Sequence, residues 1–288
     1  MRKNGKTAAG SQRWKCTQCS LTTTSTRKDL TRGAEFDLFQ AYLGGKDSQA
    51  VLDETASGRS LRRRLAWCWK VPVPRPLATG EIYNQVFLDG KEVGYEWVLL
   101  AAVNQDGTVV AWQWTTSENA AAYKALLKDI PPPKVVTVDG AAGGLKAIGQ
   151  VWGEETAVQR CLIHVHRNNR ADLTFNPKTM AGKALLGLSR ALLKITSQEE
   201  ASHWEGLLQA FYNQYSGYLK ERSYAKDNPE EGIRRGRTWW YTHGRDRRVY
   251  FRLARLVRQG VLSTYLNTDL AEGLHSTTNI IESLNSRI

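Results

Sequence analysis

Two aspartates close apolar runs, and each is followed at once by a glycine. Asp89 closes the run in FLDG, and Asp139 closes the β-branched run in VVTVDG. Runs of this kind are typical of buried strands that deliver a side chain to the edge of a sheet. Two carboxylates held close together repel one another unless a cation lies between them. Hard divalent cations prefer oxygen ligands, Mg²⁺ above all where phosphates supply further oxygens, so the pair predicts metal-assisted phosphate chemistry.

A metal site of this kind requires a third acid, and Glu282 in TTNIIESLNSRI is the candidate. Thr277, Thr278 or Asn279 could cap a helix that carries Glu282 in its first turn. The helix dipole also favours a glutamate at this position, and spacing alone prefers that simpler explanation.

The elements around the aspartates are expected to form a mixed sheet over residues 79–169. Apolar alternation and Asp-Gly turns predict three sequential antiparallel strands and then a helix stopped by the prolines at 131–133. A fourth strand ending on Asp139, a helix near residues 144–152 and a fifth strand around residues 157–163 follow. This is the element order of an α/β fold of the ribonuclease H-like type, in which the first and fourth strands lie side by side. Asp89 and Asp139 are then neighbours.

The net charge of +12 is concentrated at the beginning of the chain, where residues 1–75 carry +9 and the rest +3. Such an asymmetry favours a nucleic-acid partner, with a solvated basic surface as the alternative. No apolar run approaches the ~20 residues of a membrane span, and no signal peptide opens the sequence. We therefore expect a cytoplasmic, nucleoid-associated protein without a membrane partner, whose cysteines are thiols or ligands rather than disulfides.

Residues 25–70 predict a helix-turn-helix DNA-binding domain built from helices over residues 34–45, 47–56 and 61–70. Asp47 or Ser48 is the expected N-cap of the second helix, and Ser57 with Gly58 forms the turn before a third helix that begins near Ser60.

The third helix has an apolar face for packing and a basic face that can meet phosphates or base edges, which favours DNA binding. The alternative to a DNA-binding domain is an ordinary three-helix surface domain with a charged stripe. The residues that define these faces are Arg62, Arg63 and Arg64 on one and Leu61, Leu65 and Trp69 on the other. Residues 71–78 are proline-rich and predict a stiff linker.

Residues 1–24 resemble part of a zinc ribbon, because Cys16 and Cys19 form one Cys-x2-Cys pair behind a hairpin-like run. Structural zinc needs four ligands, so Zn²⁺ is expected only if a second pair is present. The alternative is two nearby thiols.

Residues 170–276 predict a helical insertion domain, with arginines interleaved with aromatic residues between positions 234 and 258. The arginines can clamp phosphates and the aromatics can stack on unpaired bases. Equally, the aromatics can be the core of the insertion and the arginines its solvated face, since adjacent tryptophans cannot both face one way on a helix. The candidate DNA-binding residues here are Arg234, Arg235, Arg237, Arg245, Arg247, Arg248, Trp239 and Trp240.

Taken together, FLDG, VTVDG, QRCLIHVHRN with its Cys161-x2-His164, and TTNIIESLNSRI resemble the mutator-type family of bacterial insertion-sequence transposases, a branch of the DDE class. The resemblance implies that Asp89, Asp139 and Glu282 are the catalytic, metal-binding acids. It also implies that residues 277–288 begin the core helix that carries the third acid. Cys161 and His164 match a family motif near the active site.

On physical grounds alone, Cys161 is expected to be a packed strand residue and His164 a contact to DNA or to another site residue. A joint zinc site of these two residues with Cys16 and Cys19 has the right ligand count but would tie the amino-terminal module to the catalytic sheet, so we disfavour it.

The implied mechanism uses two Mg²⁺ ions about 3.5–4 Å apart to cleave DNA at the terminal inverted repeats and to join the freed 3′-OH to target DNA. A homo-oligomer on DNA is expected, since paired ends usually require at least a dimer. A ribonuclease H-like nuclease or resolvase would use the same acids without joining strands. An inactive remnant or a DNA-binding regulator would lack cleavage altogether. The family pattern extends beyond both ends of this sequence, so the chain is expected to be truncated at each end.

Overall fold

The computed structural model describes residues 1–24, 28–45, 49–52, 58–93 and 96–285. Contacts divide the chain into two compact units, Met1–Pro74 and a second unit that begins at Arg75. Each unit is described by itself below.

The first unit opens with a small antiparallel sheet of order β1-β2-β3. Its strands are β1 (Arg2–Lys6), β2 (Gln12–Lys15) and β3 (Thr22–Thr24). Cys16 and Cys19 lie in the turn between the second and third strands, where the Cys16 N–H donates to the carbonyl of Leu21 at 2.8 Å. The hairpin-like run is therefore one strand larger than the sequence predicted.

Helices make up the rest of the first unit. They are α1 (Lys28–Gly44), α2 (Gln49–Leu52), α3 (Arg59–Leu65) and the 3-10 turn η1 (Cys68–Lys70). α1 begins before the predicted residue 34, whereas α3 begins close to the predicted Ser60. The predicted caps Asp47 and Ser48, and Ser57 of the turn, lie outside the described residues.

The core of these helices contains Leu61 and Leu65, as predicted, together with Phe39 and Cys68. The prediction for Trp69 is wrong, because 61% of this residue is exposed and it only touches the edge of Phe39. α3 ends at Leu65 and η1 follows, so the helical spacing that would have aligned Trp69 with Leu61 is broken.

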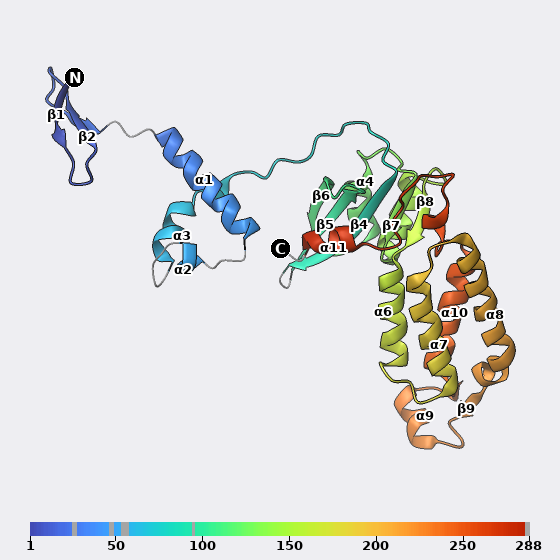
Figure 1. Cartoon of the computed structure of the whole chain (residues 1–288). Coiled ribbons are helices and arrows are strands. Elements are labelled where there is room, and N and C mark those ends of the chain that lie inside the picture. Colours follow the sequence, from blue (N-terminus) through green and yellow to red (C-terminus); the bar gives the residue numbers. More distant parts are fainter. Residues whose placement is uncertain (25–27, 46–48, 53–57, 94–95, 286–288) are drawn as a thin grey trace. The chain divides into compact units, whose positions relative to one another are not determined.

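The second unit contains a mixed α/β core with a five-stranded sheet of order β6-β5-β4-β7-β8 (Figure 1). The strands are β4 (Gln85–Val93), β5 (Trp97–Asn104), β6 (Val109–Thr115), β7 (Val135–Val138) and β8 (Ala157–Arg160). β4 pairs with β5 antiparallel and with β7 parallel. The predicted adjacency of the first and fourth strands of this sheet is thus confirmed.

Helices cover both faces of this sheet. α4 (Ala120–Leu127) and α5 (Ala142–Val151) pack on Val86 and Leu88 of β4 and their neighbours, whereas α11 (Asn279–Asn285) packs Ile281 on Phe87. Side chains alternate along a strand, so Asp89 lies on the same face as Phe87. The strand pattern therefore directs this carboxylate to the side of the sheet where α11 lies.

A helical region follows β8 and is built on its own apolar core. The four long helices of this region all contribute to that core. These helices are α6 (Leu162–Leu173), α7 (Met180–Ala191), α8 (Gln198–Lys220) and α10 (Gly244–Arg258), with the shorter elements η2 (Leu192–Lys194), α9 (Pro229–Arg235) and η3 (Thr264–Leu266). α6 runs continuously across residue 170, where the sequence placed the start of the insertion.

Trp239 and Trp240 lie on a strand rather than on one of the helices of this region. They belong to β10 (Trp239–Tyr241), which pairs antiparallel with β9 (Arg222–Tyr224). Alternation along the strand exposes 39% of Trp239 and buries Trp240, so the two adjacent indoles face opposite ways.

Candidate functional site

The register of two parallel strands brings Asp89 and Asp139 to the same level. Leu88 of β4 pairs with Val138 of β7, and the two aspartates are the next residues on their strands. The expectation that the first strand ends on Asp89 is wrong, because its antiparallel pairing with β5 continues to Val93. Only β7 ends at this level, whereas β4 continues. Asp89 is therefore a mid-strand residue, and it borders the site because the neighbouring strand β7 stops beside it.

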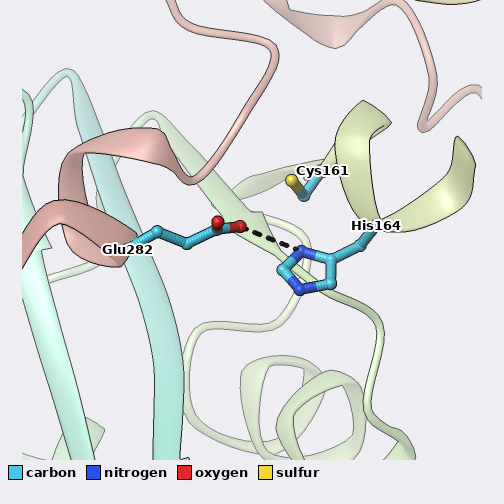
Figure 2. A group of neighbouring side chains, drawn as sticks. All are labelled: Cys161, His164 and Glu282. Atoms are coloured by element: carbon cyan, nitrogen blue, oxygen red, sulfur yellow. Dashed lines mark ion pairs between the residues drawn. The ribbon is translucent and has the colours of Figure 1, made fainter. Parts of the chain in front are cut away.

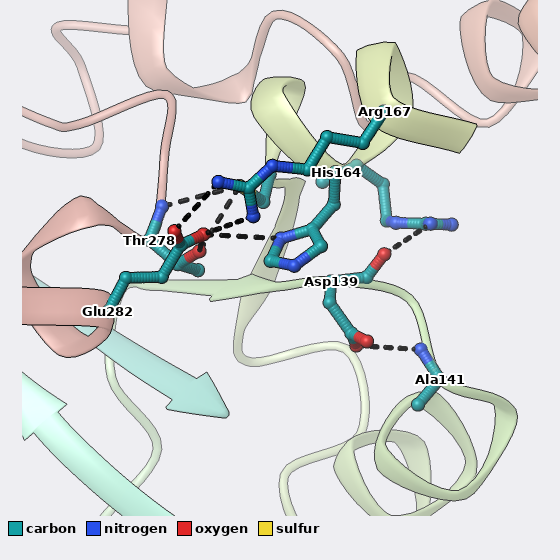
Figure 3. A network of polar contacts seen from close by, with 8 residues as sticks. Asp139, Ala141, His164, Arg167, Thr278 and Glu282 are labelled. Atoms are coloured by element: carbon teal, nitrogen blue, oxygen red, sulfur yellow. Dashed lines mark hydrogen bonds and ion pairs between the residues drawn. The ribbon is translucent and has the colours of Figure 1, made fainter. Parts of the chain in front are cut away.

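The glycines that follow the aspartates have steric roles. Gly140 has φ +98°, and a Cβ at this position would overlap the guanidinium of Arg160. That guanidinium donates to the backbone carbonyl of Asp139 at 2.6 Å, while the N–H of Ala141 donates to its carboxylate at 2.8 Å. Arg160 thus fixes the backbone of Asp139, and the Ala141 N–H fixes its side chain (Figure 3).

Asp89 is in an environment that disfavours its charge. Burial raises the pKa of its carboxyl to about 6; His164 opposes this shift, and repulsion from Asp139 and Glu118 adds to it. An additional cation beside the two aspartates would remove this electrostatic cost.

Glu118 is a fourth acid that the sequence analysis did not select. Its carboxylate lies where a Cβ on Gly90 would have to be, and it accepts a hydrogen bond from the Tyr123 hydroxyl at 3.1 Å. Burial raises the pKa of Glu118, and the nearby Asp139 raises it further. Glu118 belongs to the irregular segment TTSEN immediately before α4, which carries no periodic signal that would have predicted this proximity.

Glu282 lies in the first turn of α11, as predicted, and its N–H donates to the carbonyl of Thr278. Its carboxylate is oriented toward α6, where Arg167 donates to both oxygens at 3.2 and 3.1 Å (Figure 3). The Nδ1 atom of His164 is 3.8 Å from Oε1. The sequence analysis missed Arg167, although it continues the three-residue spacing of Cys161 and His164 along one helix face.

Cys161 and His164 lie at the junction between β8 and α6. Cys161 is fully buried and is the N-cap residue of α6, so its assignment to a strand is wrong. Its N–H still donates to Val138 of β7, but its carbonyl accepts from Val165 and so begins the helix. Figure 2 shows Cys161, His164 and Glu282 gathered in one group.

His164 is the electrostatic neighbour of all three predicted acids. The sulfur of Cys161 beside the ring is the main cause that raises the pKa of His164; burial opposes this, and Glu282 and Asp139 add to it. Its positive charge in turn favours the ionised form of Asp89. The arrangement therefore places Asp89, Asp139 and Glu282 within electrostatic reach of one imidazole.

The candidate DNA-binding arginines differ in how far they are already paired. All except Arg247 are exposed, namely Arg62, Arg63, Arg64, Arg234, Arg235, Arg237, Arg245 and Arg248. Arg64 is 3.6 Å from Glu35, Arg234 and Arg235 both pair with Glu231, and Arg248 pairs with Asp172. Arg247 lies over the rings of Tyr241 and Phe251. Arg237 and Arg245 pair with no acid within the described ranges.

An open cleft of about 770 Å³ lies beside these arginines in the helical region. Arg234, Arg235, Arg245 and Arg248 line it together with Tyr241. Trp240 is buried, as the core alternative expected, whereas the phosphate-binding role of the arginines stays a prediction.

The cysteine pair of the amino-terminal sheet has no further ligands in the described part of the chain. Hydrogen bonds from the backbone of Cys19 and Gln18 lower the pKa of Cys16. The only cluster of three or more histidine, cysteine or acidic side chains found among the described residues with ligand-like proximity is Cys161, His164 and Glu282.

None of the described helices is both long and apolar enough to span a membrane. No curated protein matches the sequence. Residues 77–228, more than half of the chain, match the family described as "Transposase, Mutator family", which confirms the resemblance inferred from the motifs. With this match covering the sheet and most of the helical region, the chain belongs to the Mutator family of transposases.

Proposed function

We propose that this transposase cleaves DNA at the ends of its element by a DDE mechanism and transfers the freed strand to target DNA. The observation that carries the proposal is the register that brings Asp89 and Asp139 together on adjacent parallel strands. The strand order and the crossing of α11 over the sheet support a ribonuclease H-like classification of the core.

The donor set of the two aspartates fits Mg²⁺. Both side chains offer oxygen, and the raised pKa of Asp89 indicates that negative charge here lacks full compensation. Asp89 and Asp139 would hold the metal, and Glu282 would complete the set as the third acid. When bound, Mg²⁺ would supply Lewis-acid activation of the attacking oxygen and would stabilise charge on the phosphate.

The reaction that we propose has two steps of the same kind. Water first attacks the phosphorus and displaces the 3′ oxygen, which leaves as a 3′-OH. This 3′-OH then attacks a phosphorus of the target strand and displaces the 3′ oxygen of the target strand. The Ala141 N–H orients Asp139, and Arg167 orients Glu282. His164, close to all three acids, is placed to hold a proton during these steps.

DNA would be bound through the exposed arginines of both units. We propose that α3 of the first unit acts within a helix-turn-helix and contacts the terminal inverted repeats through Arg62, Arg63 and Arg64, which are exposed on it. Arg237 and Arg245 would contact the phosphates near the cleavage site. A homo-oligomer would hold the two ends together, and a complete ribbon at Cys16 and Cys19 would take Zn²⁺.

The test is cleavage and joining of a DNA substrate that carries the element's terminal repeats. Asp89→Asn and Asp139→Asn should each abolish Mg²⁺-dependent cleavage, while retaining DNA binding in a gel-shift assay. Asp129→Asn is the matched control, because this acid is exposed and pairs with Lys128 at 3.8 Å, away from the aspartates. Full cleavage by Asp89→Asn would refute the assignment. Cleavage without joining would identify a nuclease or resolvase, and binding without cleavage by the wild type a DNA-binding relic.

A further inference from the structure

Three side chains of different chemistry meet between α6 and α11. The sulfur of Cys161, a ring nitrogen of His164 and a carboxylate oxygen of Glu282 all lie within 4.8 Å of one another (Figure 2). Cys161 is the N-cap of α6 and His164 lies in the first turn of this helix, whereas Glu282 comes from a helix more than one hundred residues further along the chain. Their convergence depends on tertiary structure and not on local spacing.

The sulfur of Cys161 has the surroundings of a metal thiolate. It is fully buried and accepts hydrogen bonds from the backbone N–H and the hydroxyl of Thr278, at 3.3 and 3.2 Å. Donors of this kind orient ligands and tune metal sites from the second layer of contacts.

The Nδ1 atom of His164 is the second observation that indicates a missing ligand. It is buried and makes no hydrogen bond of standard geometry in the described part of the chain, because the 3.8 Å separation from Glu282 is too long and the other polar atom beside it is the sulfur of Cys161. A buried, unpaired ring nitrogen is costly. A metal ion bound between the imidazole and the carboxylate would satisfy it.

We propose that Cys161, His164 and Glu282 form a binding site for a zinc-class divalent transition metal, separate from the carboxylate site of Asp89 and Asp139. Sulfur and nitrogen donors select zinc-like ions over Mg²⁺, which prefers oxygen. Glu282 can give Oε1 to the metal in place of its 3.2 Å contact with Arg167, while Oε2 remains paired with Arg167 at 3.1 Å. Three protein ligands leave a fourth tetrahedral position open.

Such a metal would fasten α11 to the beginning of α6. The consequence for catalysis rests on the proposed function, because this metal and Arg167 would occupy both oxygens of Glu282 and would therefore compete with Mg²⁺ for the third acid. The binding site itself does not rest on that function. It requires only the three ligands and the contacts of Thr278 and Arg167 around them.

Cobalt substitution tests the site directly in the full-length chain. The background variant Cys16→Ser with Cys19→Ser removes the other adjacent thiols, and circular dichroism checks folding. Titration with Co²⁺ should give thiolate-to-cobalt charge-transfer absorption that saturates at one ion per chain. Cys161→Ser and His164→Ala should remove this absorption, and Glu282→Gln should weaken Zn²⁺ binding about tenfold or more in a chelator competition. Asp89→Asn should retain the absorption, and excess Mg²⁺ should not displace it.

Absence of charge-transfer absorption in the folded background variant would overturn the proposal, as would absorption that survives Cys161→Ser. If Asp89→Asn abolishes DNA cleavage while Co²⁺ fails to bind at Cys161, only the metal site proposed here fails. If Co²⁺ binds as expected while Asp89→Asn cleaves DNA normally, only the proposed function fails.

Discussion

Thr278 donates two hydrogen bonds to the sulfur of Cys161, one from its backbone N–H at 3.3 Å and one from its hydroxyl at 3.2 Å. The two residues are 117 positions apart in the sequence and both are fully buried. The same hydroxyl lies 3.4 Å from the carboxylate of Glu282. A single side chain thus connects the start of α6 with the acid on α11.

Replacing Thr278 by valine keeps its shape and removes the hydroxyl. We expect Thr278→Val to lower the free energy of unfolding by about 1–2 kcal/mol, because the sulfur and the carboxylate lose the single O–H donor that they share. Urea denaturation measures this change. Thr238→Val, at an exposed threonine, is the control and should be close to neutral. An unchanged midpoint in Thr278→Val would show that this hydroxyl does not stabilise the α6–α11 junction.

Neutralising Asp89 should stabilise the metal-free protein. Because the folded-state pKa is raised to about 6 from the ordinary value of 3.8, the native state binds more protons than the unfolded state between these pH values. The contribution of Asp89 therefore makes stability fall as pH rises from about 4 to 6 and remain low above that. Asp89→Asn should recover roughly 2–3 kcal/mol at pH 7.5.

The measurement is a series of urea titrations between pH 4 and 8 in the presence of EDTA. The difference between Asp89→Asn and wild type should vanish near pH 4 and reach its full value above pH 6. Asp129→Asn should show no such dependence. A variant that is less stable than wild type at pH 7.5 would contradict the electrostatic account of this site.

Glu118 should contribute to cation binding through its charge. Removing a carboxylate near Asp89 and Asp139 lowers the negative potential at the site, so Glu118→Gln is expected to weaken Mg²⁺ binding severalfold. The Mg²⁺ dependence of DNA cleavage measures this, with exposed Glu154→Gln as control. Identical Mg²⁺ titration curves for Glu118→Gln and wild type would exclude Glu118 from the site.

Gly140 cannot accept a side chain without cost. Its positive φ and the overlap of a Cβ with Arg160 lead us to expect that Gly140→Ala loses about 2 kcal/mol or more. Gly149→Ala is the matched control, since a Cβ added there would meet nothing within 4 Å and alanine favours the interior of α5. The midpoint of thermal denaturation should therefore fall for Gly140→Ala and rise for Gly149→Ala. Equal effects would contradict the proposed packing of Arg160 on the turn.

Two arginines of α10 are expected to have different roles, Arg245 in DNA binding and Arg252 in the stability of the fold. Arg245 is exposed, so Arg245→Gln should weaken DNA binding. The slope of the logarithm of the binding constant against the logarithm of the salt concentration should become shallower by about 0.9, the value for one lost phosphate contact. Arg252 pairs with Asp172 at 2.6 Å and donates to Asn169 at 2.9 Å. Arg252→Gln should instead lower the unfolding free energy by about 1–3 kcal/mol. A stable Arg252→Gln with weak DNA binding would reverse these roles.

The proximity of Asp89 and Asp139 could be predicted because strand order and apolar runs determine which strands are adjacent. The length of a strand is less predictable, because it depends on its partner. Pairing with β5 carries β4 through Asp89 and Gly90 to Val93, although Asp-Gly is a turn signal. The assignment of Cys161 to a strand failed for a related reason, since its N–H still belongs to the ladder while its carbonyl begins a helix.

Other site residues could not be predicted because their roles come from packing. Glu118 reaches the aspartates only because Gly90 leaves room for its carboxylate, and Thr278 contacts Cys161 only because α11 packs on the sheet. The opposite orientations of Trp239 and Trp240 were expected for adjacent residues, but the strand that carries them was not predicted. A three-residue strand is too short for its own period to be recognised.

α6 has a mechanical consequence for the site. The contacts of Glu282 lie at one end of this helix, while Asp172 near the other end is clamped by Arg248 and Arg252 of α10. Twelve helical residues span about 18 Å of continuous backbone. A phosphate that competes for Arg248 would leave Asp172 held by Arg252 alone, so we expect occupancy of this distant anchor to influence how firmly α6 holds Glu282.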